Sequence, residues 1–196
     1  HQLNEDIGLM RGIPNMTVLV PADAPQTAKC VHAAAEWPGP VYCRFSRTNF
    51  PTVTSVEDPF AIGPCYVMRD GSDVTLAGCG IMVSRCLEAA ATLEGDGVSA
   101  RVINVATVKP LDVVTLSKAA RETGAIVAAE EHTVLHGVGG AIASAVAQSH
   151  PVPMEFVGVQ DVFGESGDAF ELMEKYGLTT AKIVEGARRA MKRRGR

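Results

Sequence analysis

The sequence predicts an α/β fold with a mostly parallel sheet, and residues 73–147 give the main support. Short apolar runs alternate there with helix-forming segments, in the order 73–80, 82–93, 100–106, 112–123 and 125–131. The apolar runs are unbroken rather than alternating in polarity, which is typical of strands that helices cover on both faces. Asp112 is a suitable N-cap for the second of these helices, and Gly124 is a suitable stop.

The chain before residue 65 predicts a partial α/β unit followed by a linker. Its expected elements are a helix capped by Asn4, a strand, a helix capped by Asp23 and a second strand, over residues 1–13, 16–21, 24–37 and 41–45. Two strands are too few for a stable sheet, so the unit is expected to be part of a larger domain. Residues 46–64 are polar and long for a connection within one domain. We therefore predict domains at 1–64, with the linker, and at 65–196.

The second domain is expected to hold five strands, one of them antiparallel. The pair Asp70-Gly71 is a strong turn signal, so Tyr66–Met68 and residues 74–77 are expected to form a hairpin with an antiparallel edge strand. The apolar run at 154–160 predicts the last strand. Helices are expected after it at 169–177 and 181–192. The predicted architecture is a mostly parallel five-stranded sheet with one antiparallel edge strand.

Composition excludes several classes of function. The formal net charge of -4 gives no electrostatic case for nucleic acid or for an anionic membrane. No apolar stretch approaches the roughly 20 residues that a membrane-spanning helix needs. The five cysteines are odd in number and contain no CxxC pair, which favours reduced thiols in a cytoplasmic protein. The chain begins at His1 without a methionine, so we expect a fragment or a processed form.

Two glycine-containing turns and one acidic pair are candidate sites that we interpret as structural. Residues 78–80 read Gly-Cys-Gly between a strand and a helix, but the rest of a dinucleotide fingerprint is absent, so a tight turn is favoured. The glycines at 137–140 precede a helix, where close packing is favoured over anion binding. Glu130 and Glu131 adjoin in a strand and therefore point to opposite faces, which excludes a paired acid and base.

Arg44 and Arg47 stand near the end of the strand at 41–45. Two guanidinium groups at such a position are able to grip a phosphate through bidentate hydrogen bonds. Spacing alone leaves a solvated arginine and a phosphate clamp equally open.

Three stretches together resemble the C-terminal part of transketolase, above all the C-terminal subunit of bacterial split transketolases. The first is HQLNEDIGLMRGIPNMTVLVPAD, which begins at the histidine of a Gly-Pro-Thr-His-Gln motif in that family. The second is SRTNFP, at 46–51. The third is VAAEEHTVLHGVGGAIASAVA, followed by VQDVFGESG and ELMEKYGLT. The resemblance extends over essentially all 196 residues.

This resemblance implies a fold, an activity and two site residues. The fold would be part of a pyrimidine-binding domain for thiamine diphosphate, followed by a C-terminal domain. The activity would be transfer of two-carbon ketol units between sugar phosphates in carbohydrate metabolism, including the pentose phosphate reactions. His1 would be the catalytic and substrate-binding residue that contacts the donor's hydroxyls, and Arg47 would bind the sugar phosphate. The partners would be an N-terminal transketolase subunit and a second copy in a homodimer.

The same resemblance places the cofactor ligands outside this chain. The family's activating glutamate and its diphosphate and Mg²⁺ ligands belong upstream, so we expect no thiamine diphosphate or metal ligands here and little activity from the chain alone. Two related alternatives remain, deoxyxylulose-phosphate synthase and the beta subunit of 2-oxo-acid dehydrogenases. A third alternative is a non-catalytic dimerisation or scaffold module of a thiamine enzyme.

Overall fold

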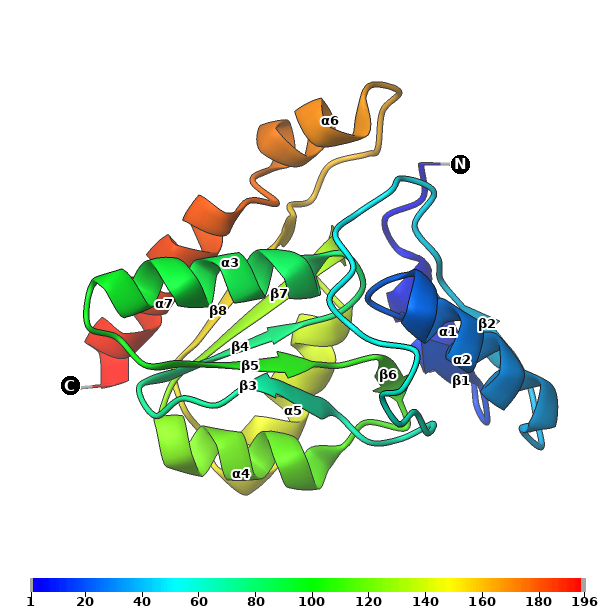
Figure 1. Ribbon diagram of the computed structural model, residues 1–196, viewed down its shortest axis with the longest axis horizontal. Coiled ribbons are helices and arrows are strands. Elements are labelled where there is room, and N and C mark those ends of the chain that lie inside the picture. Colours follow the sequence, from blue (N-terminus) through cyan, green and yellow to red (C-terminus); the bar gives the residue numbers. More distant parts are fainter. Residues whose placement is uncertain (1, 195–196) are drawn as a thin grey trace.

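The computed structural model describes residues 2–194, and its core is the predicted five-stranded sheet with strand order β3-β5-β4-β7-β8 (Figure 1). The strands are β1 (Thr17–Leu19), β2 (Val41–Cys43), β3 (Tyr66–Arg69), β4 (Val74–Gly78), β5 (Ala100–Asn104), β6 (Thr107–Lys109), β7 (Ile126–Thr133) and β8 (Met154–Val159). The helices are α1 (Asp6–Gly12), α2 (Ala24–Glu36), α3 (Met82–Gly95), α4 (Val113–Thr123), α5 (Val138–Ser149), α6 (Ala169–Tyr176) and α7 (Thr180–Arg194). Only β3 runs antiparallel in this sheet, so the predicted α/β fold class is confirmed.

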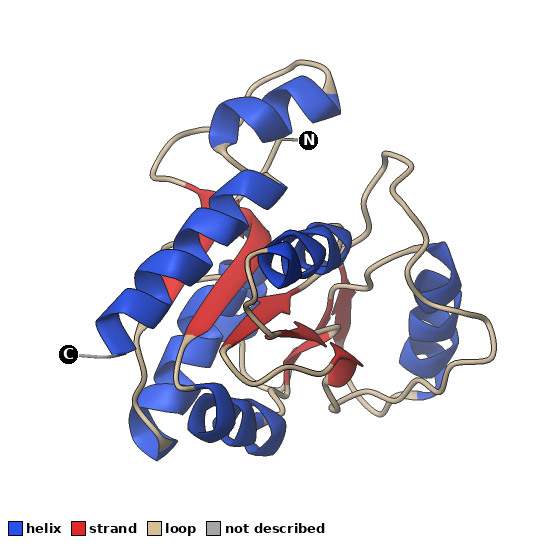
Figure 2. Cartoon of the chain, turned by 60° about the vertical axis from the view of Figure 1, so that its left-hand side comes forward, coloured by secondary structure: helices blue, strands red, loops and turns tan. Residues whose placement is uncertain are grey.

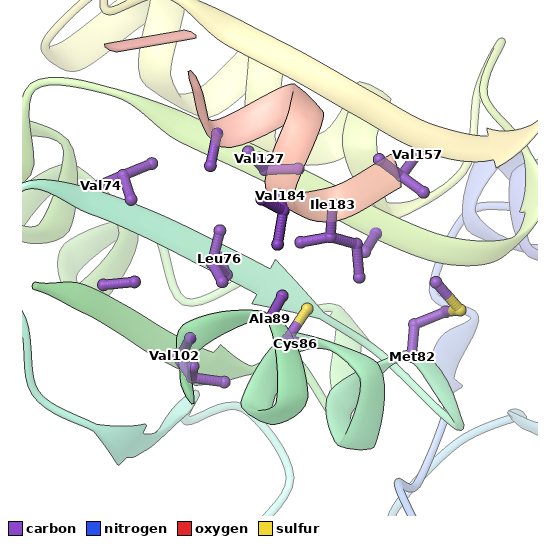
Figure 3. Packing of buried hydrophobic residues seen from close by; sticks show 14 of the residues in the cluster. Val74, Leu76, Met82, Cys86, Ala89, Val102, Val127, Val157, Ile183 and Val184 are labelled. Carbon is purple, nitrogen blue, oxygen red and sulfur yellow. The ribbon is translucent and has the colours of Figure 1, made fainter. Parts of the chain in front are cut away.

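Helices cover both faces of the five-stranded sheet, as Figures 1 and 2 show. Helices α3 and α7 pack on one face, where Leu76 of β4 meets Cys86 and Ile183 (Figure 3). Helices α4 and α5 pack on the other face, where Ala77 of β4 meets Leu116. All five residues of β4 are buried. Burial on both faces explains why this strand is mainly apolar, and its one polar side chain, Thr75, shares a buried hydrogen bond with the hydroxyl of Thr123.

A smaller sheet, with order β2-β1-β6, lies beside the large one. Strand β1 is parallel to β2 and antiparallel to β6. Helix α4 begins at Val113, directly after the predicted cap Asp112, but the short strand β6 at Thr107–Lys109 was not predicted. A proline disfavours helical backbone at the residue before it, and Lys109 precedes Pro110. A strand from beyond residue 65 therefore completes the sheet of the N-terminal unit.

The expected hairpin between residues 66–68 and 74–77 is also wrong. Strand β3 pairs with β5, because β5 and β7 already occupy both edges of β4. The turn before β4 crosses the start of β5 instead. There the N–H groups of Ser72 and Asp73 donate to the carbonyl of Ser99, and Gly71 lies so close that a Cβ would sit 2.3 Å from the Ala100 carbonyl carbon.

Several predicted helix ends are confirmed, and one is corrected. The carboxylates of Asp23 and Asp112 accept hydrogen bonds from the first turns of α2 and α4, and Gly124 ends α4 in the left-handed conformation. The expected cap at Asn4 is wrong, since α1 begins after Glu5. The carbonyl of Asn4 instead accepts from the Thr133 N–H at the end of β7, at 2.9 Å.

The cysteines are free thiols in the described part of the chain. Burial raises the pKa of Cys30, Cys65 and Cys86 to about 12, so these thiols are unreactive near neutral pH. Within residues 2–194, no helix combines the length and apolar composition needed to cross a lipid bilayer.

Candidate functional site

A cleft of about 580 Å³ opens at the carboxyl ends of β7 and β8. Its walls are the first described residues, the segment after β2, and the segment from residue 164 through α6 to Leu178. Gln2 joins two of these walls, because its side-chain amide donates to the Ser166 hydroxyl at 3.1 Å. The carboxyl edge of a parallel sheet is where ligands bind in open α/β folds. The cleft is therefore the first candidate for the functional site.

Among the residues that the structure describes, the charged groups that line this cleft leave one cation without a partner. Glu165 pairs with Lys175 at 2.5 Å and accepts from the hydroxyl of Tyr176. Glu131 pairs with Arg44 at 3.1 Å. Within residues 2–194, the exposed guanidinium of Arg47 has no hydrogen-bonding or ion-pairing partner. The cleft thus presents one unpaired guanidinium to an anionic ligand.

Arg47 also lines an adjoining cleft of about 600 Å³ that reaches the start of α2. The segment that carries it is anchored at its far end by Asp23, whose carboxylate accepts from the N–H groups of Val53 and Thr54 at 2.7 and 2.6 Å and from the Thr54 hydroxyl at 2.6 Å. Partial burial tends to raise the pKa of Asp23, but these hydrogen bonds and the one from Gln26 outweigh it and lower that pKa. Asp23 therefore acts as a charged anchor as well as a helix cap.

The near end of the same segment is anchored by Arg44. Its Nε atom lies 3.0 Å from Oδ2 of Asp6, and its Nη1 atom lies 3.1 Å from Oε2 of Glu131. The hydroxyl of Tyr42 donates to the same Asp6 oxygen at 2.8 Å. Arg44 is therefore neither a solvated arginine nor a free clamp. Of the two arginines that the sequence singled out, Arg47 alone faces the cleft unpaired within the described residues.

The adjacent carboxylates at the end of β7 point to opposite sides, as predicted. Glu131 faces the cleft, whereas Glu130 is buried and accepts from the N–H groups of Val138 and Gly139 at 2.6 and 2.9 Å. The start of α5 thus binds an anion of its own chain. A Cβ on Gly137 would sit 1.8 Å from Oε2 of Glu130, which explains the glycine. The glycines thus allow close packing, as predicted, but the N–H groups at the start of α5 also bind a carboxylate, although the sequence interpretation ranked anion binding second.

His132 connects β7 to α1. Its Nδ1 atom lies 2.9 Å from the carbonyl of Thr133 and must donate there, so its Nε2 atom accepts from the N–H of Gly8 at 3.3 Å. Burial lowers the pKa of His132, which keeps the ring neutral. Arg11 of α1 donates to the His136 carbonyl at 2.9 Å. Helix α1, which follows the first described residues, is therefore attached through Gly8 and Arg11 to the end of β7 and to the β7–α5 connection.

Comparison with known proteins identifies the family. The models described as "Transketolase, C-terminal domain" and "Transketolase, pyrimidine binding domain" match residues 63–183 and 1–53. The chain belongs to the transketolase family. The resemblance found in the sequence is thereby confirmed. The matched ranges do not fix the domain boundary, so the division near Pro64 stays a prediction.

The relatives of this transketolase chain include subunits and longer enzymes. It is 41% identical over 194 residues to a 6-deoxy-6-sulfo-D-fructose transketolase subunit of Clostridium sp. (strain MSTE9), covering 99% of this chain and 60% of that protein. It is 36% identical to the 1-deoxy-D-xylulose-5-phosphate synthase of Heliobacterium modesticaldum, covering 93% and 29%. A solved structure described as a split gene transketolase, inactive beta4 tetramer, matches with a TM-score of 0.94 and 46% identity, covering 99% and 63%. The chain spans about 60% of the length of the first of these relatives.

Of the two predicted site residues, Arg47 and His1, the structure describes only Arg47. Arg47 lines the cleft, as described above, together with Gln2 and Asn4. His1 lies outside the described residues, so its role stays a prediction. Sequence reasoning missed Asp6 and saw Asp23 only as a helix cap. A carboxylate at the N-cap or in the first turn of a helix is too common a feature to have distinguished either residue.

We expect replacement of Glu130 by glutamine to change the pH dependence of stability. Burial raises the pKa of Glu130 to about 7, although the two N–H donors and nearby arginines oppose this. A carboxyl group with a raised folded-state pKa contributes stability below its unfolded pKa of about 4.3, and that contribution falls as pH rises to 7. The stability of the wild type relative to Glu130→Gln should therefore decrease by roughly 2–3 kcal/mol between pH 4.5 and 7.5. Urea unfolding at a series of pH values measures this, and a pH-independent difference would contradict it.

Proposed function

We propose that this chain is the C-terminal part of a thiamine diphosphate-dependent transketolase that transfers two-carbon ketol units between sugar phosphates. The observation that carries the proposal is the unpaired guanidinium of Arg47 in the cleft beside Gln2 and Asn4. A sugar phosphate is a small anion whose oxygens match the planar donors of arginine. Membership of the transketolase family supports the reaction class.

In this proposal the chain binds and orients substrate, and a partner chain supplies the cofactor ligands. Arg47 holds the phosphate, while His1 contributes hydrogen bonds to the donor's hydroxyls. The family resemblance places the ligands of Mg²⁺ and of the cofactor's diphosphate upstream of this chain, and within residues 2–194 no cluster of three or more His, Cys, Asp or Glu side chains is arranged to hold a metal ion. An N-terminal subunit or domain would hold both. The assembly is proposed to be a homodimer of such units in the cytoplasm, and the chain alone to be inactive.

Two other functions each have one observation in their favour. Identity of 36% to a 1-deoxy-D-xylulose-5-phosphate synthase favours a reaction that uses pyruvate. The neighbour described as an inactive tetramer favours a scaffold role for the chain by itself. A substrate panel on the chain reconstituted with its N-terminal partner separates them. Turnover of ketose phosphates supports the transketolase, turnover of pyruvate the synthase, and no turnover at all the scaffold.

We expect Arg47→Gln to raise the KM of the reconstituted enzyme for a sugar phosphate at least about tenfold. A charge-assisted hydrogen bond contributes roughly 1.5–3 kcal/mol, which corresponds to that factor or more. The value of kcat/KM for the corresponding unphosphorylated sugar should stay unchanged. Arg121→Gln, which removes an exposed arginine on α4, is the control. Equal losses on both sugars would contradict a phosphate role for Arg47.

A further inference from the structure

The ion pairs of Arg44 join three segments that are far apart in the sequence. Asp6 belongs to the first turn of α1, Arg44 follows β2, and Glu131 lies near the end of β7. Two of these segments form walls of the cleft. Residues 2–4 precede Glu5, the N-cap of α1, and Arg47 stands three residues after Arg44. The network therefore fixes the separation between the start of the chain and the free guanidinium.

Asp6 is the buried member of this network. It is only 4% exposed, and its Oδ2 atom accepts from both Arg44 and Tyr42, while its buried Oδ1 atom has no hydrogen-bonding partner among residues 2–194. Burying a carboxylate is costly, and a buried ion pair contributes little net stability compared with apolar packing. Such a group is better explained by the geometry that it specifies than by the stability that it adds.

The segment that carries Arg47 is held at both ends by contacts that do not involve Asp6. The Asp6 carboxylate is therefore not needed to attach this segment. Asp23 holds the far end of the segment through Val53 and Thr54. At the near end, the backbone N–H of Arg44 donates to the carbonyl of Leu19 at 2.9 Å, which fixes the strand. The guanidinium of Arg44 then reaches across to α1 and β7. Removing the Asp6 carboxylate would free α1 from β2 while both ends of the segment stay attached.

We propose that Asp6 is a positioning residue, which acts through Arg44 to set the distance and orientation between the start of the chain and the phosphate-binding Arg47. This inference rests on the proposed function of Arg47. We expect its effect to be specific to phosphorylated substrates, because in the proposed function only the phosphate group binds Arg47. Glu131 supports the same geometry from β7, and its replacement by glutamine has the same effect in weaker form.

The test is a double-mutant cycle on the chain reconstituted with its N-terminal partner. We expect Asp6→Asn to raise the KM for a sugar phosphate about five- to tenfold with little change in kcat, and to leave kcat/KM for the unphosphorylated sugar unaltered. Added to Arg47→Gln, it should have no further effect, because there is no longer a guanidinium to position. Asp70→Asn, an exposed carboxylate on the β3–β4 turn, is the matched control.

Each outcome of this cycle decides one of the two claims. If Arg47→Gln raises the KM strongly and adding Asp6→Asn raises it further, Asp6 has a structural role only and the inference is overturned. The same holds if Asp6→Asn lowers kcat/KM equally for the phosphorylated and the unphosphorylated sugar. If Arg47→Gln leaves the KM unchanged, the phosphate role in the proposed function fails first, and the inference fails with it. Thermal unfolding shows whether Asp6→Asn folds. Should it not fold, Glu131→Gln must show the phosphate-specific rise in KM, and its absence overturns the inference.

Discussion

Replacing Gly137 by alanine is expected to lower the free energy of unfolding by about 3–5 kcal/mol, because the new methyl group has no space. Its Cβ would lie 1.8 Å from Oε2 of Glu130 and 2.5 Å from Nδ1 of His132. Neither group is free to move away. Glu130 is 1% exposed and receives two N–H groups from α5, and His132 is fully buried between β7 and α1. Displacing the carboxylate would leave the start of α5 without hydrogen-bonding partners.

Gly95→Ala is the matched control for this prediction. Nothing lies within 4 Å of a Cβ at Gly95, which ends α3 without a positive φ. The same chemical change there should be neutral or stabilising by up to about 1 kcal/mol. Urea unfolding of the full chain, followed by circular dichroism, measures both variants. A loss below about 1 kcal/mol for Gly137→Ala would show that the Glu130 carboxylate can shift, contrary to its geometry here.

The fold was largely predictable because burial on both faces leaves a clear trace in the sequence. Strand β4 is mainly apolar, as are the first four residues of β7, and Gly124 and Gly177 end helices in the left-handed conformation that favours glycine. Strand β6 has no comparable sequence pattern. It has three residues, and its pairing with β1 joins Val18 to Lys109, which lies almost half the chain's length further on. Pairings of this range are set by tertiary packing rather than by local pattern.

The sequence indicated a residue of the candidate site only where that residue belongs to a recognisable motif. Arg47 belongs to a recognisable motif, and its guanidinium faces the cleft with no partner in the described residues. Asp6 was not predictable, because its partner Arg44 lies 38 residues away and Glu131 lies a further 87 residues beyond Arg44. Whether a carboxylate is buried, paired or free depends on such contacts. The residues that position the arginine therefore emerge only from the structure.

Replacing Asp23 by alanine is expected to lower the free energy of unfolding by about 2–4 kcal/mol and to release the segment that carries Arg47. The change removes the cap of α2 and leaves the N–H groups of Val53 and Thr54 without their acceptor. Because hydrogen bonds lower the pKa of Asp23, its stabilisation is present above the unfolded pKa and is lost as pH falls through the lower folded pKa. The difference between wild type and Asp23→Ala should therefore shrink in acid.

Asp168→Ala separates loss of a helix cap from loss of the anchor. Asp168 caps α6 by accepting from the N–H groups of Phe170 and Glu171, and within residues 2–194 its side chain makes no hydrogen bond to another segment. Its replacement should lower the free energy of unfolding by only about 1 kcal/mol. Hydrogen exchange of the full chain should become faster at Val53 and Thr54 in Asp23→Ala and stay unchanged there in Asp168→Ala. Equal losses of stability, with residues 53–54 still protected, would mean that Asp23 serves α2 alone and that the Arg47 segment is held by other contacts.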